Sequence, residues 1–322
     1  MDGLTVWFVV WSVDGLCTVL NHYALPHSRT LGFHLPYFLA FLGLFSPFLL
    51  QPHDAVFRAV LSLASVFYFC KVREVLVEPR FAQEPLLVKF CSVGVSFFDM
   101  SDRSKAVDSN RMPRFAIKMF WMGVHITAQL ACLELVNYRH LLPVNSAVRT
   151  QITCMVLCLY FFFSLHAFSY ALQANLILLM PQYDFQALMD SPEHASTVRG
   201  FWKRWDLVIQ KLLFKYVYKT CKQISKNTEL SIALTFLASG LVHVWPILAA
   251  SLNNWPEALE MFAYFVYQLG IIAVEAKLLG MPKVANLVQH HAWIGKLWSI
   301  THLFGPSYLL IHPAMALARV DF

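Results

Sequence analysis

The sequence predicts an all-α, polytopic membrane protein of about eight transmembrane helices. Hydrophobic residues make up 58% of its 322 residues and charged residues only 14%, whereas about a quarter of a typical soluble domain is charged. Apolar runs of about 20 residues, the length that crosses a bilayer, recur along the chain. These features exclude intrinsic disorder and argue against a soluble globular enzyme.

Eight apolar runs predict eight membrane spans within a single integral-membrane domain, 1–322. The spans are expected at 4–22, 33–51, 55–76, 117–137, 150–178, 229–252, 257–278 and 297–318. The run 150–178 is long enough to hold a break, which Gln173–Asn175 would mark. The N-terminal residues Met1–Leu4 are acidic rather than basic, so we expect the first run to be a retained span and not a cleaved signal peptide.

Positive charge between the apolar runs predicts the orientation. Most Lys and Arg residues fall in 71–118 and 190–227, and the positive-inside rule places both stretches in the cytosol. The connections 52–54 and 253–256 carry no Lys or Arg, which suits the luminal side. Both termini are then luminal. We interpret the net charge of +6 as a topology signal and not as a nucleic-acid surface, because the sequence has no recognisable nucleic-acid motif.

The segment 199–228 differs from the spans because its charges follow one face. Lys211, Lys215 and Lys219 recur every four residues, and apolar residues cover the other side. This pattern predicts a basic amphipathic helix that lies in the cytosolic interface. Two roles stay open for it: an anchor on anionic lipid, or a surface that meets a phosphorylated cytosolic substrate.

Ionisable residues within a membrane are costly, so each one is a candidate for function. The sequence offers His125, Glu134, His166, His243 and Glu275. Glu134 and Glu275 lie near predicted span ends, where we expect them to reach water. His125 and His166 are isolated on apolar helices, and we expect them to be hydrogen-bonded core histidines.

His243 is better placed for chemistry. It lies about 20 Å from the cytosolic start of its helix, and Gly240 allows another helix or a substrate to approach closely. Ser239 lies four residues earlier on the same face and can orient the ring, and Pro246 is expected to loosen the helix just beyond it. A buried neutral imidazole beside a small residue is suited to act as a general base.

Two motifs carry a resemblance to a known family. The first is Ser191-Pro192, then Ser196-Thr197-Val198-Arg199, and then the box Phe201-Trp202-Lys203-Arg204-Trp205-Asp206. The second is Ser239-Gly240-Leu241-Val242-His243, whose histidine comes 37 residues after Asp206. In this order and spacing they resemble the membrane-bound O-acyltransferases. The nearest branch is the wax-synthase-like one, which includes fungal acetyltransferases of terpenoids and meroterpenoids.

The box departs from the family pattern in two ways. It is one residue shorter than the form common in fungal members, and Asp206 stands where the family has His or Asn. An aspartate can still orient or hydrogen-bond a substrate, but its charge differs. The departure bears on substrate identity first and on activity second.

The resemblance implies transfer of an acyl group from acyl-CoA, with acetyl-CoA favoured, to the hydroxyl of a lipophilic terpenoid or meroterpenoid in secondary metabolism. It implies that His243 and Asp206 are the catalytic residues, with His243 as general base. Six further residues are expected to bind substrate: Trp202, Trp205, Ser239, Arg199, Lys203 and Arg204. It implies no metal and no permanently bound cofactor, and the family usually resides in the endoplasmic reticulum.

Three alternatives stay open. A wax-ester synthase acting on long-chain alcohols fits the same motifs. An intramembrane isoprenoid cyclase would use Asp206 to protonate or steer a carbocation. A transporter or inactive scaffold is compatible with intramembrane His and Glu residues, although the sequence shows no repeated halves. The oligomeric state is also open.

Overall fold

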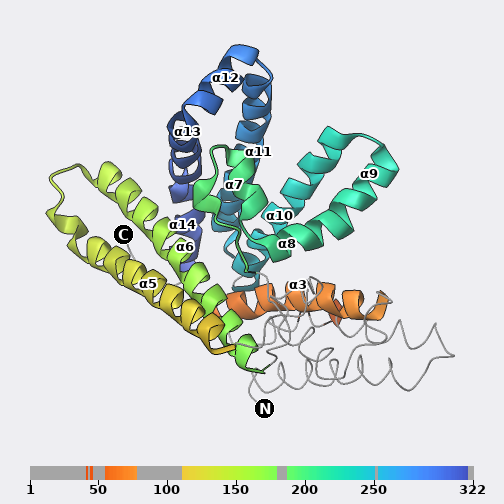
Figure 1. Cartoon of the computed structure of the whole chain (residues 1–322), viewed down its shortest axis with the longest axis horizontal. Helices are drawn as coiled ribbons and strands as arrows, with labels where there is room; N and C mark the ends of the chain where they lie inside the picture. The colour runs from red at the N-terminus through yellow and green to blue at the C-terminus, as the bar shows by residue number, and fades with distance from the viewer. Residues whose placement is uncertain are drawn as a thin grey trace. The chain divides into compact units, whose positions relative to one another are not determined.

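The computed structural model describes residues 41–42, 44–45, 55–77, 111–179, 187–250 and 253–317 (Figure 1). Every regular element in this part of the chain is a helix, which confirms the all-α class. The predicted span 4–22, nearly all of 33–51 and most of the basic stretch 71–118 lie outside the described residues.

The chain separates into two compact units. The first comprises Met1–Asp99, Leu241–Leu259 and Ala316–Val320, and the second comprises Met100–Gly240, Glu260–Met315 and Asp321–Phe322. That the whole chain, 1–322, acts as one integral-membrane domain stays a prediction.

Within the described ranges, four helices are long and apolar enough to cross a membrane. They are α5 (Arg111–Asn137) with the turn η4 (Tyr138–Leu141), α6 (Ser146–Leu179), α10 (Thr228–Ala250) and α11 (Trp255–Leu279). They match four predicted spans, and α3 (Ala55–Val77) covers a fifth. The protein is therefore a polytopic membrane protein, and the number eight stays a prediction.

The expected break in α6 is wrong, because this helix runs unbroken through 34 residues. The side-chain amides at the expected break donate within the helix: Gln173 to the hydroxyl of Ser169 at 3.0 Å, and Asn175 to the carbonyl of Ala171 at 2.8 Å. At 1.5 Å per residue α6 is about 51 Å long, which exceeds the roughly 30 Å of a hydrocarbon core.

The last predicted span, 297–318, is divided between two helices. The chain after α11 forms α12 (Pro282–His290), α13 (Ala292–Phe304) and α14 (Ser307–Leu317). The break falls at Gly305-Pro306, where proline lacks an N–H to continue the helical hydrogen bonds. A hydropathy pattern averages over such a break, so the sequence suggests one span where the structure has two shorter helices.

The predicted amphipathic helix 199–228 is also divided. It consists of α7 (Val198–Arg204), α8 (Leu207–Leu213), a π-helical turn η6 (Phe214–Tyr218) and α9 (Lys219–Ser225). The short turn η5 (Pro192–His194) precedes them. Asp206 causes the break, because its side chain caps α8 and starts a new helix at Leu207. Its place in the cytosolic interface stays a prediction.

Helices α5 and α6 lie side by side in the second unit (Figure 1). The amide of Gln129 donates to the hydroxyl of Ser164 at 2.6 Å and joins them. The other face of α5 exposes large apolar side chains, as expected of a helix that meets lipid. They include Ile117, Phe120, Trp121, Leu130, Leu133 and Leu135.

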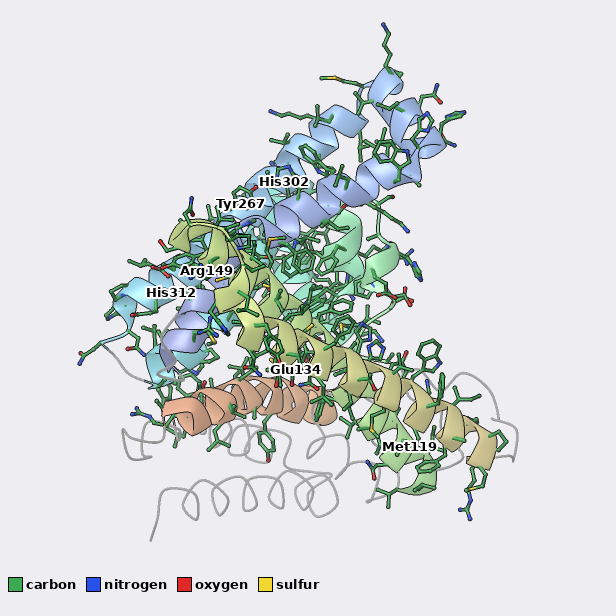
Figure 2. All side chains as sticks on the ribbon, turned by 90° about the vertical axis from the view of Figure 1, so that its left-hand side faces the viewer. Met119, Glu134, Arg149, Tyr267, His302 and His312 are labelled. Atoms are coloured by element: carbon green, nitrogen blue, oxygen red, sulfur yellow. The ribbon has the colours of Figure 1, made fainter. Side chains whose placement is uncertain are left out.

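Polar contacts join the C-terminal helices of this unit to one another. The hydroxyl of Tyr267 on α11 lies 2.7 Å from Nδ1 of His302 on α13, and Figure 2 shows the two side chains close together. Nδ1 of His312 on α14 lies 2.7 Å from the carboxylate of Glu260 on α11. Ile311 of α14 packs against buried Cys154 and Leu157 of α6. These contacts join α11 to α13 and α14, and α14 to α6.

Candidate active site

The box 201–206 occupies the corner between α7 and α8, and local sequence determines this corner. The hydroxyl of Thr197 accepts a hydrogen bond from the N–H of Gly200 at 2.8 Å and caps α7. The chain becomes extended at Trp205, and Oδ1 of Asp206 then accepts from the N–H of Ile209 at 3.0 Å. With these two caps nine residues apart, the box comprises the last four residues of α7, the extended Trp205 and the cap of α8.

A buried glutamate secures the start of α7. Glu275 of α11 is only 4% exposed, and its carboxylate accepts hydrogen bonds from the N–H groups of Val198 at 2.6 Å and Arg199 at 3.4 Å. The prediction that Glu275 reaches water is therefore wrong. The first N–H groups of a helix have no partner within that helix, and a carboxylate at this end is a favourable acceptor for them. Glu134, by contrast, is exposed, and that it reaches water stays a prediction.

Helix α13 packs closely against the same segment. A methyl group added at Gly295 would overlap the carbonyl oxygen of Ser196, the residue just before the cap of α7. Only glycine allows this approach of helix and backbone. The chain leading into the box is thus held by α11 through Glu275 and by α13 through Gly295.

Trp202 of the box packs against α10 and α11. Its ring meets Phe236 edge-on at 5.5 Å between centroids and lies 5.8 Å from Phe265. The indole N–H donates to the side-chain oxygen of Gln268 at 3.3 Å. Gln268 is fully buried, and its amide donates in turn to the carbonyl of His302 at 2.7 Å. This relay fixes the orientation of Trp202.

Trp205 packs on a different group of rings. It stacks on Phe201 at 5.2 Å and on Phe162 of α6 at 5.8 Å. The two tryptophans of the box therefore reach different helices, with Trp202 against α10 and α11 and Trp205 against α6. Through these two side chains the box contacts α6, α10 and α11.

Asp206 is a partly buried carboxyl group outside the four spanning helices. Burial raises the pKa of Asp206 to about 6, although the N–H groups of Ile209 and Val208 act in the opposite direction. A carboxyl with this pKa exchanges its proton near neutral pH. Asp206 is therefore suited both to capping α8 and to hydrogen bonding with a substrate.

Three cationic residues lie in or just before the box, and two of them are exposed. Arg199 and Lys203 are exposed, and Arg204 is partly buried, with its carbonyl accepting from the N–H of Asp190 at 2.9 Å. Exposed cations on one short helix are available to phosphate groups in solution.

Ser239 and His243 lie one turn apart on α10, which continues unbroken through Pro246 to Ala250. Gly240 allows a close helix contact as expected, because a Cβ there would lie 3.0 Å from that of Phe265. His243 is partly buried and belongs to the first unit, whereas the box and Ser239 belong to the second. That His243 and Asp206 act at one site stays a prediction.

Two histidines that the sequence treats as isolated lie together. The rings of His125 on α5 and His166 on α6 are stacked, 4.6 Å apart and 8° from parallel. Nδ1 of His125 and Nε2 of His166 are buried without a hydrogen-bond partner among the described residues. The prediction of hydrogen-bonded core histidines is therefore wrong at these atoms. An unsatisfied buried polar atom costs about 1–3 kcal/mol.

Sequence reasoning missed the supporting role of α11. Gln268 and Glu275 are seven residues apart, which places both on one face of a helix. Two polar side chains that share a face of an apolar helix are a signal of a buried polar contact, and this signal was present in the sequence. The stacking of His125 on His166 had no such signal, because it depends on the register between α5 and α6.

Comparison with models of protein families identifies a family for this sequence. A model of the MBOAT family, the membrane-bound O-acyltransferase family, matches residues 80–254. The matched range includes both the box 201–206 and His243. No curated protein matches the sequence.

Proposed function

The chain belongs to the membrane-bound O-acyltransferase family, and we propose that it transfers an acyl group from acyl-CoA to the hydroxyl of a lipophilic acceptor. The observation that carries the proposal is the extent of the family match, since residues 80–254 include both the box and His243. The endoplasmic reticulum is the proposed membrane, with 71–118 and 190–227 in the cytosol.

In the proposed reaction the acceptor oxygen attacks the thioester carbonyl. A carbon–oxygen bond forms, the carbon–sulfur bond breaks, and the products are an ester and coenzyme A. His243 takes the proton from the hydroxyl as general base and returns it to the leaving thiolate. His243 is partly buried on an apolar helix, and the neutral form of an imidazole is the one that accepts a proton.

Asp206 and the two tryptophans of the box are proposed to hold the substrates in line. Asp206 offers a carboxyl oxygen to a hydroxyl, and Trp202 and Trp205 offer flat apolar surface. Their positions are set by Gln268, Phe201 and the cap of α8, so the geometry is formed before substrate binds. Such preorganisation is a large part of rate enhancement.

The cations beside the box are proposed to bind the phosphates of coenzyme A. Arg199 and Lys203 are exposed on α7, and Arg204 follows them. Ser239, one turn before His243, is proposed to orient the imidazole. Acetyl-CoA is the proposed donor and a terpenoid or meroterpenoid alcohol the proposed acceptor, with wax-ester synthesis from long-chain alcohols as the second candidate.

Release of coenzyme A by the purified full chain tests the proposal. The protein in detergent is offered acetyl-CoA or palmitoyl-CoA with farnesol, hexadecanol or no acceptor. We expect release that depends on the acceptor, and at least a 100-fold loss of turnover in His243→Ala. His291→Ala is the matched control, because this histidine is exposed on the second unit.

Each result discriminates between the candidates. Release with acetyl-CoA and farnesol supports a terpenoid acetyltransferase, whereas release only with palmitoyl-CoA and hexadecanol supports a wax-ester synthase. Full turnover in His243→Ala would refute the proposed base. No release with any donor from folded protein would refute acyl transfer, and conversion of an isoprenoid without mass change would favour a cyclase using Asp206.

A further inference from the structure

The stacked pair His125–His166 is a buried polar feature of the second unit to which no role has been assigned. Parallel rings 4.6 Å apart cannot hydrogen-bond to each other, because imidazole donors and lone pairs lie in the ring planes. His166 is only 7% exposed, and its Nε2 has no hydrogen-bond partner among the described residues. Buried polar groups of native proteins are normally paired, so an absent molecule is expected to meet this nitrogen.

Aromatic rings surround the pair and connect it to the family box. Tyr170 stacks on His125 at 5.5 Å, and Phe162 lies 4.6 Å from His166. Phe162 also stacks on Trp205, at 5.8 Å. The ring of Phe162 therefore contacts both the histidine pair and Trp205 of the box. Asp206 is the next residue after Trp205.

The charges near the pair do not suit a polyanion. The carboxylate of Glu193 is close enough to His125, His166 and Tyr170 to act on them electrostatically. Lys118 lies over the ring of Tyr170, with Nζ 5.5 Å from its centre. Among the residues that the structure describes, Glu193 and Lys118 bring one charge of each sign, which gives no net attraction for the phosphates of coenzyme A. A neutral polar group within an apolar body is the better match.

We infer that the His125–His166 pair binds the hydroxyl of the lipophilic acceptor. This inference rests on the proposed acyl transfer and names a binding site for its second substrate. A neutral imidazole offers one donor and one acceptor, and a hydroxyl can meet either. The rings of Phe162 and Tyr170 cover the apolar body beside it. His125 lies on α5, whose exposed side chains include large apolar ones that suit contact with lipid.

The kinetic test separates acceptor binding from donor binding. Coenzyme A release is measured with the full chain for His166→Phe, His166→Gln and His125→Phe, while farnesol or acetyl-CoA is varied. Loss of one neutral hydrogen bond is expected to raise the KM for farnesol about 3- to 10-fold. The KM for acetyl-CoA is expected to stay unchanged, and His166→Gln is expected to recover part of the effect.

His140→Phe is the matched control, because His140 is exposed in the turn after α5. Unchanged farnesol KM in both His166→Phe and His125→Phe would overturn the inference, as would a rise confined to the acetyl-CoA KM. Thermal unfolding of each variant identifies any that has not folded. His166→Gln and His125→Phe carry the test if His166→Phe does not fold.

A binding measurement distinguishes failure of the inference from failure of the proposed function. Tritiated farnesol and hexadecanol are bound to the purified full chain without acyl-CoA. Binding that weakens in His166→Phe but not in His140→Phe supports the site, even if no coenzyme A is released. Equal binding by the wild type and His166→Phe, or no binding by the wild type, overturns it and leaves acyl transfer to be judged by its own assay.

Discussion

The carboxylate of Glu275 accepts a hydrogen bond of 2.6 Å from the backbone N–H of Val198, 77 residues earlier in the chain. Val198 is the first residue of α7, which has only seven residues and carries Trp202. The first N–H groups of a helix have no partner within it, and negative charge there is favoured by the helix dipole. Glu275 therefore helps to determine where the box begins.

Glu275→Ala is expected to lower the free energy of unfolding by about 1–3 kcal/mol, because two N–H groups inside the protein lose their acceptor. It should also reduce turnover, since α7 holds Trp202. Thermal unfolding and acceptor-dependent release of coenzyme A by the full chain measure both effects. Glu229→Ala, an exposed glutamate in the first turn of α10, is the control. Equal losses in the two variants would contradict a capping role.

Gly295→Ala is expected to destabilise the protein by about 1–3 kcal/mol, because the new methyl group would overlap the carbonyl oxygen of Ser196. Gly123→Ala provides the matched control, since nothing lies within 4 Å of a Cβ at that position. Alanine also favours a helix over glycine by about 1 kcal/mol, so this control should be neutral or stabilising. Similar unfolding temperatures in the two variants would show that α13 does not pack tightly against the backbone of Ser196.

Trp202 and Gln268 are expected to be energetically coupled. Trp202→Phe removes the indole N–H and leaves the buried oxygen of Gln268 without that donor, whereas Gln268→Met removes the oxygen. Each single change should cost about 1–3 kcal/mol. The double variant should cost less than the sum by about 0.5–1.5 kcal/mol. Additive costs in thermal unfolding would mean that the 3.3 Å contact contributes little.

The sequence predicts those parts of this protein that depend on local pattern. Apolar runs located α5, α6, α10 and α11, because a span is determined by about 20 consecutive residues. Two short motifs led to the family that the match over 80–254 then showed. These signals are independent of how the helices meet.

Contacts between distant helices account for what the sequence did not reveal. Glu275 looked like a residue at a water-facing span end, but α7 supplies its partners from 76 and 77 residues away. The stack of His125 on His166 requires a particular register between two helices. None of these is encoded in a window of neighbouring residues.

Asp206 is expected to make stability depend on pH. Its pKa is raised from 3.8 to about 6 in the folded protein, so between these values the folded state binds more protons than the unfolded state. The free energy of unfolding should therefore fall as pH rises from about 4 to about 6, by about 1–3 kcal/mol, and stay low above that range. Asp206→Asn keeps a side-chain oxygen to cap α8 but does not titrate, so it should lack this dependence.

Thermal unfolding of the wild type and Asp206→Asn between pH 4 and pH 8 measures the difference. Asp190→Asn is the control, because Asp190 is an exposed aspartate in the same segment and should leave the wild-type profile unchanged. The Asn variant should gain stability over the wild type above pH 6 and lose that advantage near pH 4. If the two profiles stay parallel, the carboxyl of Asp206 is hydrated and ionised in the folded protein. Its part in substrate binding would then be that of a fixed negative charge.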